Sequence, residues 1–166
     1  NIMRRTRYGR ANRRYSKIDE CAVQKNRLND AFKAMRKRGL IARQNFSCCG
    51  SCAGYEIATF VEEKLDAVKD NAPKFATTKK KIAGTVDYHQ QSTADLRASG
   101  ACYLSFGVIA TEAYGDIGLP TLEVGELVCE ILTEYEIYHE WNHTVGQCIR
   151  IDLTQSPEAS RHDRAK

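Results

Sequence analysis

The order of strand-like and helix-like segments constrains the fold of this chain more than any other feature. Residues 40–46, 82–88 and 101–109 are short apolar runs rich in β-branched and aromatic residues, and residues 137–141 form a fourth. Helical spacing marks the intervening segments 52–69 and 121–135. This β-α-β-β-α-β pattern predicts an α+β fold with a ferredoxin-like split core and its helices on one face of the sheet.

Two further elements and two polar ends complete the predicted organisation. A helix over residues 16–39, starting at Ser16 and stopping at Gly39, precedes the core, and a strand over 148–153 follows it. With 166 residues, of which 42% are hydrophobic, the chain has material for one core. We therefore expect a basic flexible arm over 1–15, one domain over 16–154 and a polar tail over 155–166. Residues 70–81 read as a solvated connection.

Three cysteines within five positions, Cys48, Cys49 and Cys52, follow the first predicted strand where the next helix starts. Free backbone N–H groups and the positive end of the helix dipole favour a thiolate at such a junction. A thiolate can ligate a metal ion or attack an electrophile. The other four cysteines lie in apolar patterns and are expected to be small buried residues: Cys21, Cys102, Cys129 and Cys148.

A right-handed crossover between strands 40–46 and 82–88 would make them parallel, so that their carboxyl ends share one edge of the sheet. This edge would gather a rim of polar residues, with His139 and His143 at the opposite edge. The rim consists of Arg43, Asn45, Cys48, Cys49, Cys52, Asp87, His89 and Gln91.

The rim suits two chemistries. Cys48 or Cys49 with Cys52, and His89 from a distance, would give zinc thiolate and imidazole ligands, although a fourth ligand is missing. Alternatively, Cys49-Gly50-Ser51-Cys52 is a C-x-x-C at the start of a helix after a strand, which is the placement used by dithiol oxidoreductases. No serine elbow, phosphate loop or paired carboxylates indicate another reaction, and the sequence leaves open whether the protein is an enzyme.

Charge is distributed unevenly along the chain. Residues 1–44 hold fourteen Lys and Arg against three acids, a balance of +11, whereas the remainder holds eleven against eighteen, a balance of −7. A basic segment of this kind suits an anionic partner, either nucleic acid or an acidic protein surface, but it also suits contact with the acidic body of the same chain. The arginines concerned are Arg4, Arg5, Arg7, Arg10, Arg13 and Arg14.

No apolar stretch has the length of a membrane span, and no apolar block follows the basic start, so we expect a cytoplasmic protein. The segment from Leu40 to Ile57, with the later Asp87-to-Thr93, Gly100-to-Gly107 and Trp141-Asn142 segments, resembles an uncharacterised bacterial domain family. That family is marked by R-Q-[ND]-F-x-C-C-x-x-C followed by H-x-Q. The resemblance implies no activity, but it implies site positions at Arg43, Gln44, Cys48, Cys49, Cys52, His89 and Gln91.

The sequence thus predicts a small α+β binding or regulatory module. Its candidate features are a Cys/His rim and a basic arm directed at an anionic partner, and the alternatives are thiol redox chemistry and zinc binding.

Overall fold

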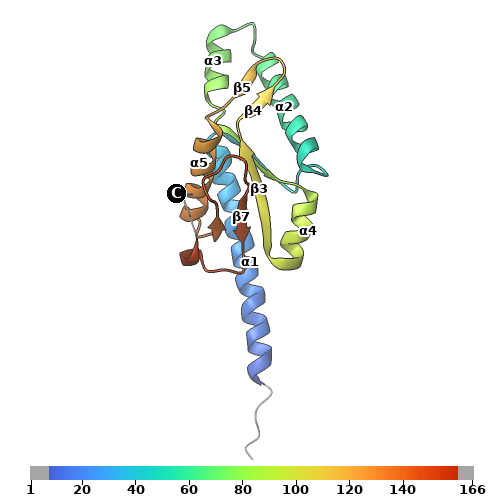
Figure 1. The fold of residues 1–166 in the computed structure, drawn as a ribbon, viewed down its shortest axis with the longest axis vertical. Helices are drawn as coiled ribbons and strands as arrows, with labels where there is room; N and C mark the ends of the chain where they lie inside the picture. Colours follow the sequence, from blue (N-terminus) through green and yellow to red (C-terminus); the bar gives the residue numbers. More distant parts are fainter. Residues whose placement is uncertain (1–7, 161–166) are drawn as a thin grey trace, which may run out of the picture.

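The computed structural model of this chain describes the backbone of residues 8–160 and the side chains of residues 22–158 and 160 (Figure 1). Its helices are α1 (Tyr8–Lys37), α2 (Gly50–Asp66), α3 (Ala72–Lys80), α4 (Gln90–Ser99) and α5 (Thr121–Glu134), with a short 3-10 turn at Pro157–Ala159. Its strands are β1 (Leu40–Gln44), β2 (Gly84–Tyr88), β3 (Ala101–Gly107), β4 (Ile109–Thr111), β5 (Gly115–Ile117), β6 (His139–Glu140) and β7 (Ile149–Asp152). The fold is α+β.

Five of the strands form one mixed sheet in the order β1-β2-β3-β7-β6. β1 and β2 are parallel, with Leu40 opposite Gly84 and Gln44 opposite Tyr88, as the crossover through α2 requires. The remaining pairs, β2–β3, β3–β7 and β7–β6, are antiparallel. β4 and β5 form a separate two-stranded sheet.

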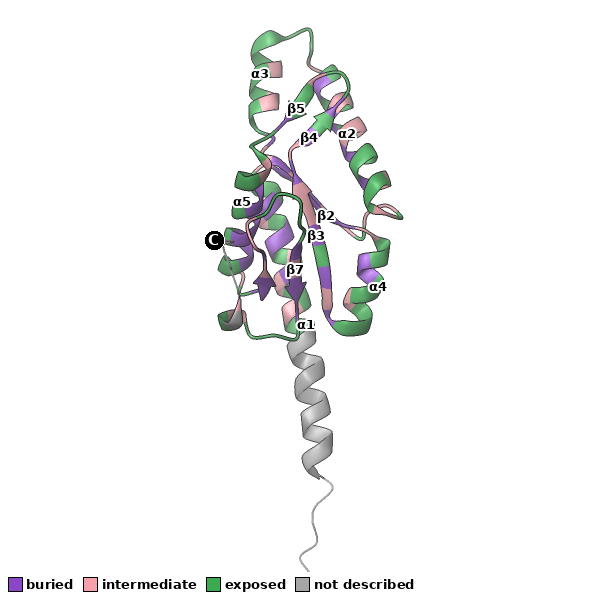
Figure 2. Ribbon diagram, viewed as in Figure 1, coloured by how far each residue is buried: buried purple, intermediate pink, exposed green. Residues whose placement is uncertain are grey.

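Helices cover both faces of the five-stranded sheet. The face that carries Ala42, Val86 and Leu104 is buried in one core with side chains of α1 and α5. The opposite face meets α2 at its β1–β2 side, where Ile41 joins a second core around Ile57, together with residues of β4 and β5. Figure 2 shows the strands mostly buried and the outer sides of the helices exposed.

The ferredoxin-like order is therefore not the one found. In that order a strand lies between the two parallel strands, whereas here β1 pairs directly with β2 and β3 is added on the other side of β2. The prediction that all helices share one face is also wrong, because α2 packs opposite α1 and α5. The predicted strand over 101–109 ends at Gly107, whose φ of 154° redirects the chain into the β4–β5 pair.

Two helices differ from the sequence prediction for identifiable reasons. α1 begins at Tyr8, so that Ser16, the predicted start, lies inside the helix. α3 lies in the segment predicted as a connection. No residue of α3 is buried, so its sequence carries no apolar stripe. The side chain of Asn71 accepts a hydrogen bond from the backbone N–H of Lys74 and so caps the first turn of α3.

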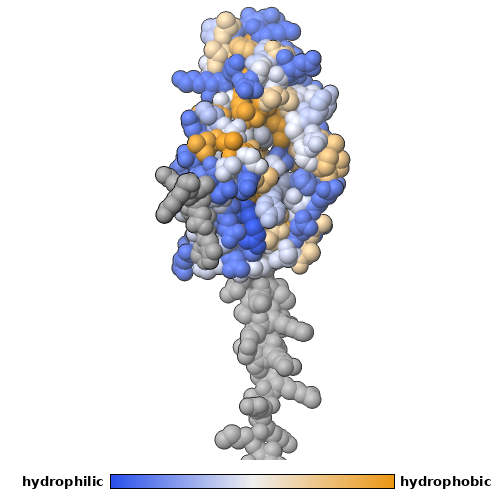
Figure 3. Space-filling model, viewed as in Figure 1, coloured by the Kyte–Doolittle hydropathy of each residue, from blue (hydrophilic) through white to orange (hydrophobic). Residues whose placement is uncertain are grey.

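The free part of the sheet face is polar. Tyr103, Arg150 and Glu140 lie side by side on β3, β7 and β6, on the face opposite α1 and α5. Arg150 bridges Glu140 at 3.2 Å and Asp152 at 2.7 Å, so these charges are paired with one another. In the view of Figure 3, hydrophobic colour gathers over the β4–β5 region, while the area below it is hydrophilic. Arg150, Glu140 and Asp152 therefore neutralise one another on this face.

Candidate functional site

The three clustered cysteines lie in the turn that joins β1 to α2, at the carboxyl end of β1. Because β1 and β2 are parallel, the turn after β2 reaches the same edge, and backbone hydrogen bonds join the two turns. The N–H of Phe46 donates to the carbonyl of Tyr88 at 3.1 Å, and the N–H of Gln90 donates to the carbonyl of Ser47 at 3.1 Å. The cysteine turn is thus held by its neighbour as well as by its own helix.

Two residues before the cysteines adopt a backbone conformation that side chains disfavour. Asn45 has φ 51° and Ser47 has φ 61°, both in the left-handed region. Asparagine tolerates this conformation well, but serine does so less readily. The hydroxyl of Ser47 donates to Oε1 of Glu56 at 2.9 Å, which fixes the turn onto the second turn of α2. Backbone strain of this kind is concentrated at functional sites in proteins.

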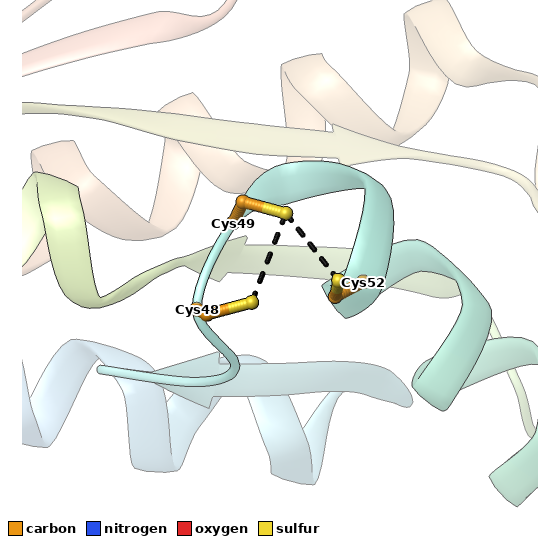
Figure 4. A group of neighbouring side chains, drawn as sticks. All are labelled: Cys48, Cys49 and Cys52. Carbon is orange, nitrogen blue, oxygen red and sulfur yellow. Dashed lines mark hydrogen bonds between the residues drawn. The ribbon is translucent and has the colours of Figure 1, made fainter.

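The three sulfur atoms face one another across this turn (Figure 4). Sγ of Cys49 lies 3.4 Å from Sγ of Cys52 and 3.9 Å from Sγ of Cys48, and all three lie within 4.8 Å of one another. Cys48 is exposed, and Cys49 and Cys52 are half-buried. Cys49 is the N-cap residue of α2, but its side chain forms no capping hydrogen bond. The sulfurs are therefore close enough to react with each other and open enough to meet a partner.

The environment separates the acidities of the two C-x-x-C thiols. The backbone N–H of Cys52, followed by its thiol, stabilises the thiolate of Cys49 and lowers the pKa of Cys49. The hydrogen bond with Cys49, and then that with Cys48, raises the pKa of Cys52 to about 11. Cys49 is therefore the thiol that ionises first, and Cys52 is the proton-bearing neighbour that donates to it.

The other predicted rim residues lie near this edge but perform separate tasks. His89 is the N-cap of α4, and its Nδ1 accepts the backbone N–H of Ser92 at 3.4 Å. A Cβ atom built on Gly50 would lie 3.9 Å from Cδ2 of His89, so the imidazole lies beside the start of α2. Among the described residues, however, the set of ligand atoms within 4.8 Å of one another contains only the three cysteines and leaves His89 out. Asn45 and Gln91 are exposed at the same edge.

Arg43 and Asp87 are neighbours in the β1–β2 register, yet the structure joins them by no ion pair. The guanidinium of Arg43 lies over the rings of Phe46, at 5.6 Å, and Phe60, at 5.1 Å. Asp87 is 5% exposed and faces the α2 side of the sheet, where burial raises its pKa to about 6. Gln44 points to the other face, where its side chain donates to Asn29 at 3.1 Å.

Sequence reasoning missed Glu56, the residue that holds the cysteine turn through Ser47. The one available signal was its position four residues after Cys52, which places it one turn along the same side of the helix. The remaining cysteines follow the prediction in part. Cys102 and Cys129 are buried, whereas Cys148, which directly precedes β7, is exposed. The side chain of Cys21 lies outside the described residues.

His139 lies on β6, the strand at the lateral edge of the sheet farthest from β1, and not at the opposite strand ends where the ferredoxin-like order had placed it. It is buried, and its Nδ1 is 2.8 Å from the carbonyl oxygen of Ile137. His143 follows in the β6–β7 connection, 4.7 Å from Trp141 between ring centres. Neither imidazole is near the sulfurs in this arrangement.

Comparison with known families places the chain. A family model described as a domain of unknown function, DUF6891, matches residues 10–155. The chain belongs to the DUF6891 family. The match covers most of the chain, including the cysteine turn and the whole sheet, and it confirms the predicted membership of a domain family of unknown function. Neither the curated proteins nor the solved structures contain a match to this DUF6891 chain. Within the described residues, no helix combines the length and apolar character needed to cross a membrane.

Proposed function

We propose that this DUF6891 chain exchanges disulfides with a partner through Cys49 and Cys52. The observation that supports the proposal is the 3.4 Å separation of the two sulfurs at the N-terminus of α2, with the pKa of Cys49 lowered and that of Cys52 raised. Dithiol exchange needs this difference in pKa, because one cysteine attacks as a thiolate while the other stays protonated until the second step.

The exchange is balanced without a cofactor. The Cys49 thiolate attacks one sulfur of the partner disulfide, a mixed disulfide forms, and the other sulfur leaves as a thiolate that takes up a proton. Cys52 then loses its proton and attacks Sγ of Cys49. The bond between Cys49 and the partner breaks, a Cys49–Cys52 disulfide forms, and the partner leaves as two thiols. The partner is reduced by two electrons, and the protein is oxidised by two.

Alkylation kinetics test the thiolate directly. At pH 7 a thiol with a pKa near 11 is ionised to about 0.01%, whereas a thiol whose pKa lies below the ordinary value is ionised to at least ~1%. Lower basicity reduces nucleophilicity and offsets part of this difference. We expect iodoacetamide to modify Cys49 at least ~10-fold faster than Cys52, as followed by peptide mass spectrometry. Equal rates at the two positions would contradict the assignment of Cys49 as the attacking thiol.

A metal site is the second candidate function, favoured by a specific distance. Sulfur ligands on a tetrahedral zinc ion, with bonds of about 2.3 Å, lie roughly 3.8 Å apart. The separations here are 3.4 Å from Cys49 to Cys52 and 3.9 Å from Cys49 to Cys48. Cys48, Cys49 and Cys52 would hold the ion, which would leave one position for water or a substrate. The predicted His89 ligand is not part of this set.

The two functions differ in their need for Cys48, which exchange does not use. For a zinc centre we expect one ion per chain in the reduced protein, measured by elemental analysis after dialysis. Cys48→Ser should then weaken zinc binding at least ~10-fold. Removing a residue that only hydrogen-bonds a metal ligand already lowers affinity by about this factor, and removing the ligand itself should cost more. Cys148→Ser is the matched control, because it removes an exposed cysteine elsewhere. Substoichiometric zinc in the wild-type protein would end this candidate.

The predicted basic arm stays a prediction. Arg4, Arg5 and Arg7 lie outside the described residues, and so do the side chains of Arg10, Arg13 and Arg14. Its support is the charge of residues 1–44 alone. A role in contacting nucleic acid or an acidic protein surface would add to the exchange chemistry rather than replace it.

A further inference from the structure

Basic side chains from three separate segments surround one cavity at the other end of β1 and β2. The cavity has a volume of about 690 Å³ and lies beside the turn from α1 to β1, where Gly39 adopts φ 92°. Ala83 donates its N–H to the carbonyl of Gly39 at 2.9 Å, which brings the chain after α3 next to this turn. The cationic residues lining it are Arg36, Lys37, Arg38, Lys64 and Lys81.

No carboxylate balances this group from within the lining, which otherwise consists of Gly39, Leu40, Ile41, Thr78 and Ile82. Within the part of the chain that the structure describes, Arg38 alone of these five has acidic partners, Glu130 at 2.9 Å and Glu134 at 3.3 Å. Among the described residues, Lys37, Lys64 and Lys81 form no ion pair. Like charges that converge on one cavity repel, and a bound anion would remove this cost.

Part of this charge has a local explanation. Arg36 and Lys37 lie in the last turn of α1, and Lys81 is the C-cap residue of α3, where cations offset the negative end of the helix dipole. Arg36 also donates to the carbonyl of Ala42 at 3.1 Å. Each helix end supplies only about half a negative charge. The five cationic side chains exceed this charge, even with Arg38 paired.

We propose that this cavity binds a small ligand that carries several phosphate groups. Lysine ammonium groups bind phosphate oxygens as point charges, and three of them from different elements would surround a short polyphosphate. The cavity has the volume of a small-molecule site, whereas a nucleic acid strand needs an extended basic groove. The inference is independent of the exchange chemistry, because none of the cysteines lines this cavity.

Inorganic tripolyphosphate and ATP without magnesium are the probes, and isothermal titration calorimetry at low and moderate salt is the measurement. The test variant is Lys64→Gln with Lys81→Gln. The matched control is Lys33→Gln with Lys69→Gln, which removes the same charge from lysines that are paired with Asp30 and Asp66 outside the cavity. Both proteins keep the N-terminal arginines, so binding to that segment affects them equally.

We expect the test variant to weaken tripolyphosphate binding at least ~10-fold and the control to weaken it less than about 2-fold. ATP should follow tripolyphosphate if the phosphates alone are recognised. Equal weakening in the two variants would show attraction by overall charge and would overturn the proposal. The proposal would also be overturned if the wild-type protein did not bind tripolyphosphate at millimolar concentration. The same holds if the binding of single-stranded DNA depended on Lys64 and Lys81 while the binding of tripolyphosphate did not.

Discussion

Cys49→Ser is expected to abolish exchange with a small disulfide such as 2-hydroxyethyl disulfide, with a loss of at least ~100-fold in rate. A serine hydroxyl at this position is not ionised at neutral pH and cannot form the mixed disulfide. Cys52→Ser should still attack, because the Cys49 sulfur and the N–H of residue 52 are kept. It should therefore accumulate the mixed disulfide, which intact-mass spectrometry detects as an adduct on Cys49.

Three outcomes separate the possible failures of this prediction. Cys148→Ser removes an exposed cysteine far along the chain and should leave the rate within about 2-fold of the wild type. If Cys49→Ser also stays within that range, Cys49 is not the attacking group. If the wild-type protein is inactive with every disulfide tried, the exchange proposal fails as a whole. An adduct on Cys48 in the Cys52→Ser protein would transfer the first step to Cys48.

Asp87→Asn is expected to stabilise the protein at neutral pH and to have little effect at pH 4. Asp87 is 5% exposed, its Oδ2 has no hydrogen-bond partner among the described residues, and burial raises its pKa to about 6 from 3.8. A carboxyl with a raised pKa binds its proton more tightly in the folded state than in the unfolded state. The free energy of unfolding therefore falls as the pH rises from about 4 through 6, and the penalty is fully present above about pH 7.

The size of the penalty follows from the shift in pKa. At 1.36 kcal/mol per unit, the ionised carboxylate costs about 3 kcal/mol at pH 7, and the amide of asparagine avoids the charge. We expect Asp87→Asn to raise the free energy of unfolding by about 2 kcal/mol at pH 7.5, measured by urea denaturation. Asp95→Asn, at an exposed position on α4, is the control and should change stability by less than about 0.5 kcal/mol.

Comparison across pH makes this prediction specific. A gain at pH 7.5 that disappears at pH 4 identifies the charge as the cause. A gain of the same size at both pH values would mean that packing around residue 87 changed instead, and the raised pKa of Asp87 would then be wrong. A loss of stability at pH 7.5 would mean that the carboxylate is compensated in solution.

The local elements were predictable from the sequence to different degrees, and the reasons are physical. α5 was found because Val124, Val128 and Leu132 place an apolar stripe against the sheet. α3 was not, because its residues bury nothing and only the cap at Asn71 marks its start. The parallel orientation of β1 and β2 was predicted from the right-handed crossover rule, but their direct pairing was not.

The arrangement of the strands could not be predicted in the same way. The choice between inserting β3 beside β1 and adding it outside β2 depends on long-range packing, and the two orders share the same local pattern. The clustering of the three cysteines was predictable because they are close in the sequence. Nothing in the sequence indicated that His89 caps α4 and does not join them. Glu56 was marked only by its position four residues after Cys52, because its role depends on the left-handed backbone of Ser47.

One helix separates the two sites considered above. α2 carries Cys52 in its first turn and Lys64 in its last, and its 17 residues span about 25 Å. No ligand of the size of a nucleotide reaches across that distance. Communication between a phosphate compound and the sulfurs would have to occur as a rigid displacement of this rod against the strands beneath it. Since Ala53, Val61 and Leu65 are fully enclosed along its length, such sliding would disturb the whole packed interface, and occupancy at either end should leave chemistry at the other unaltered.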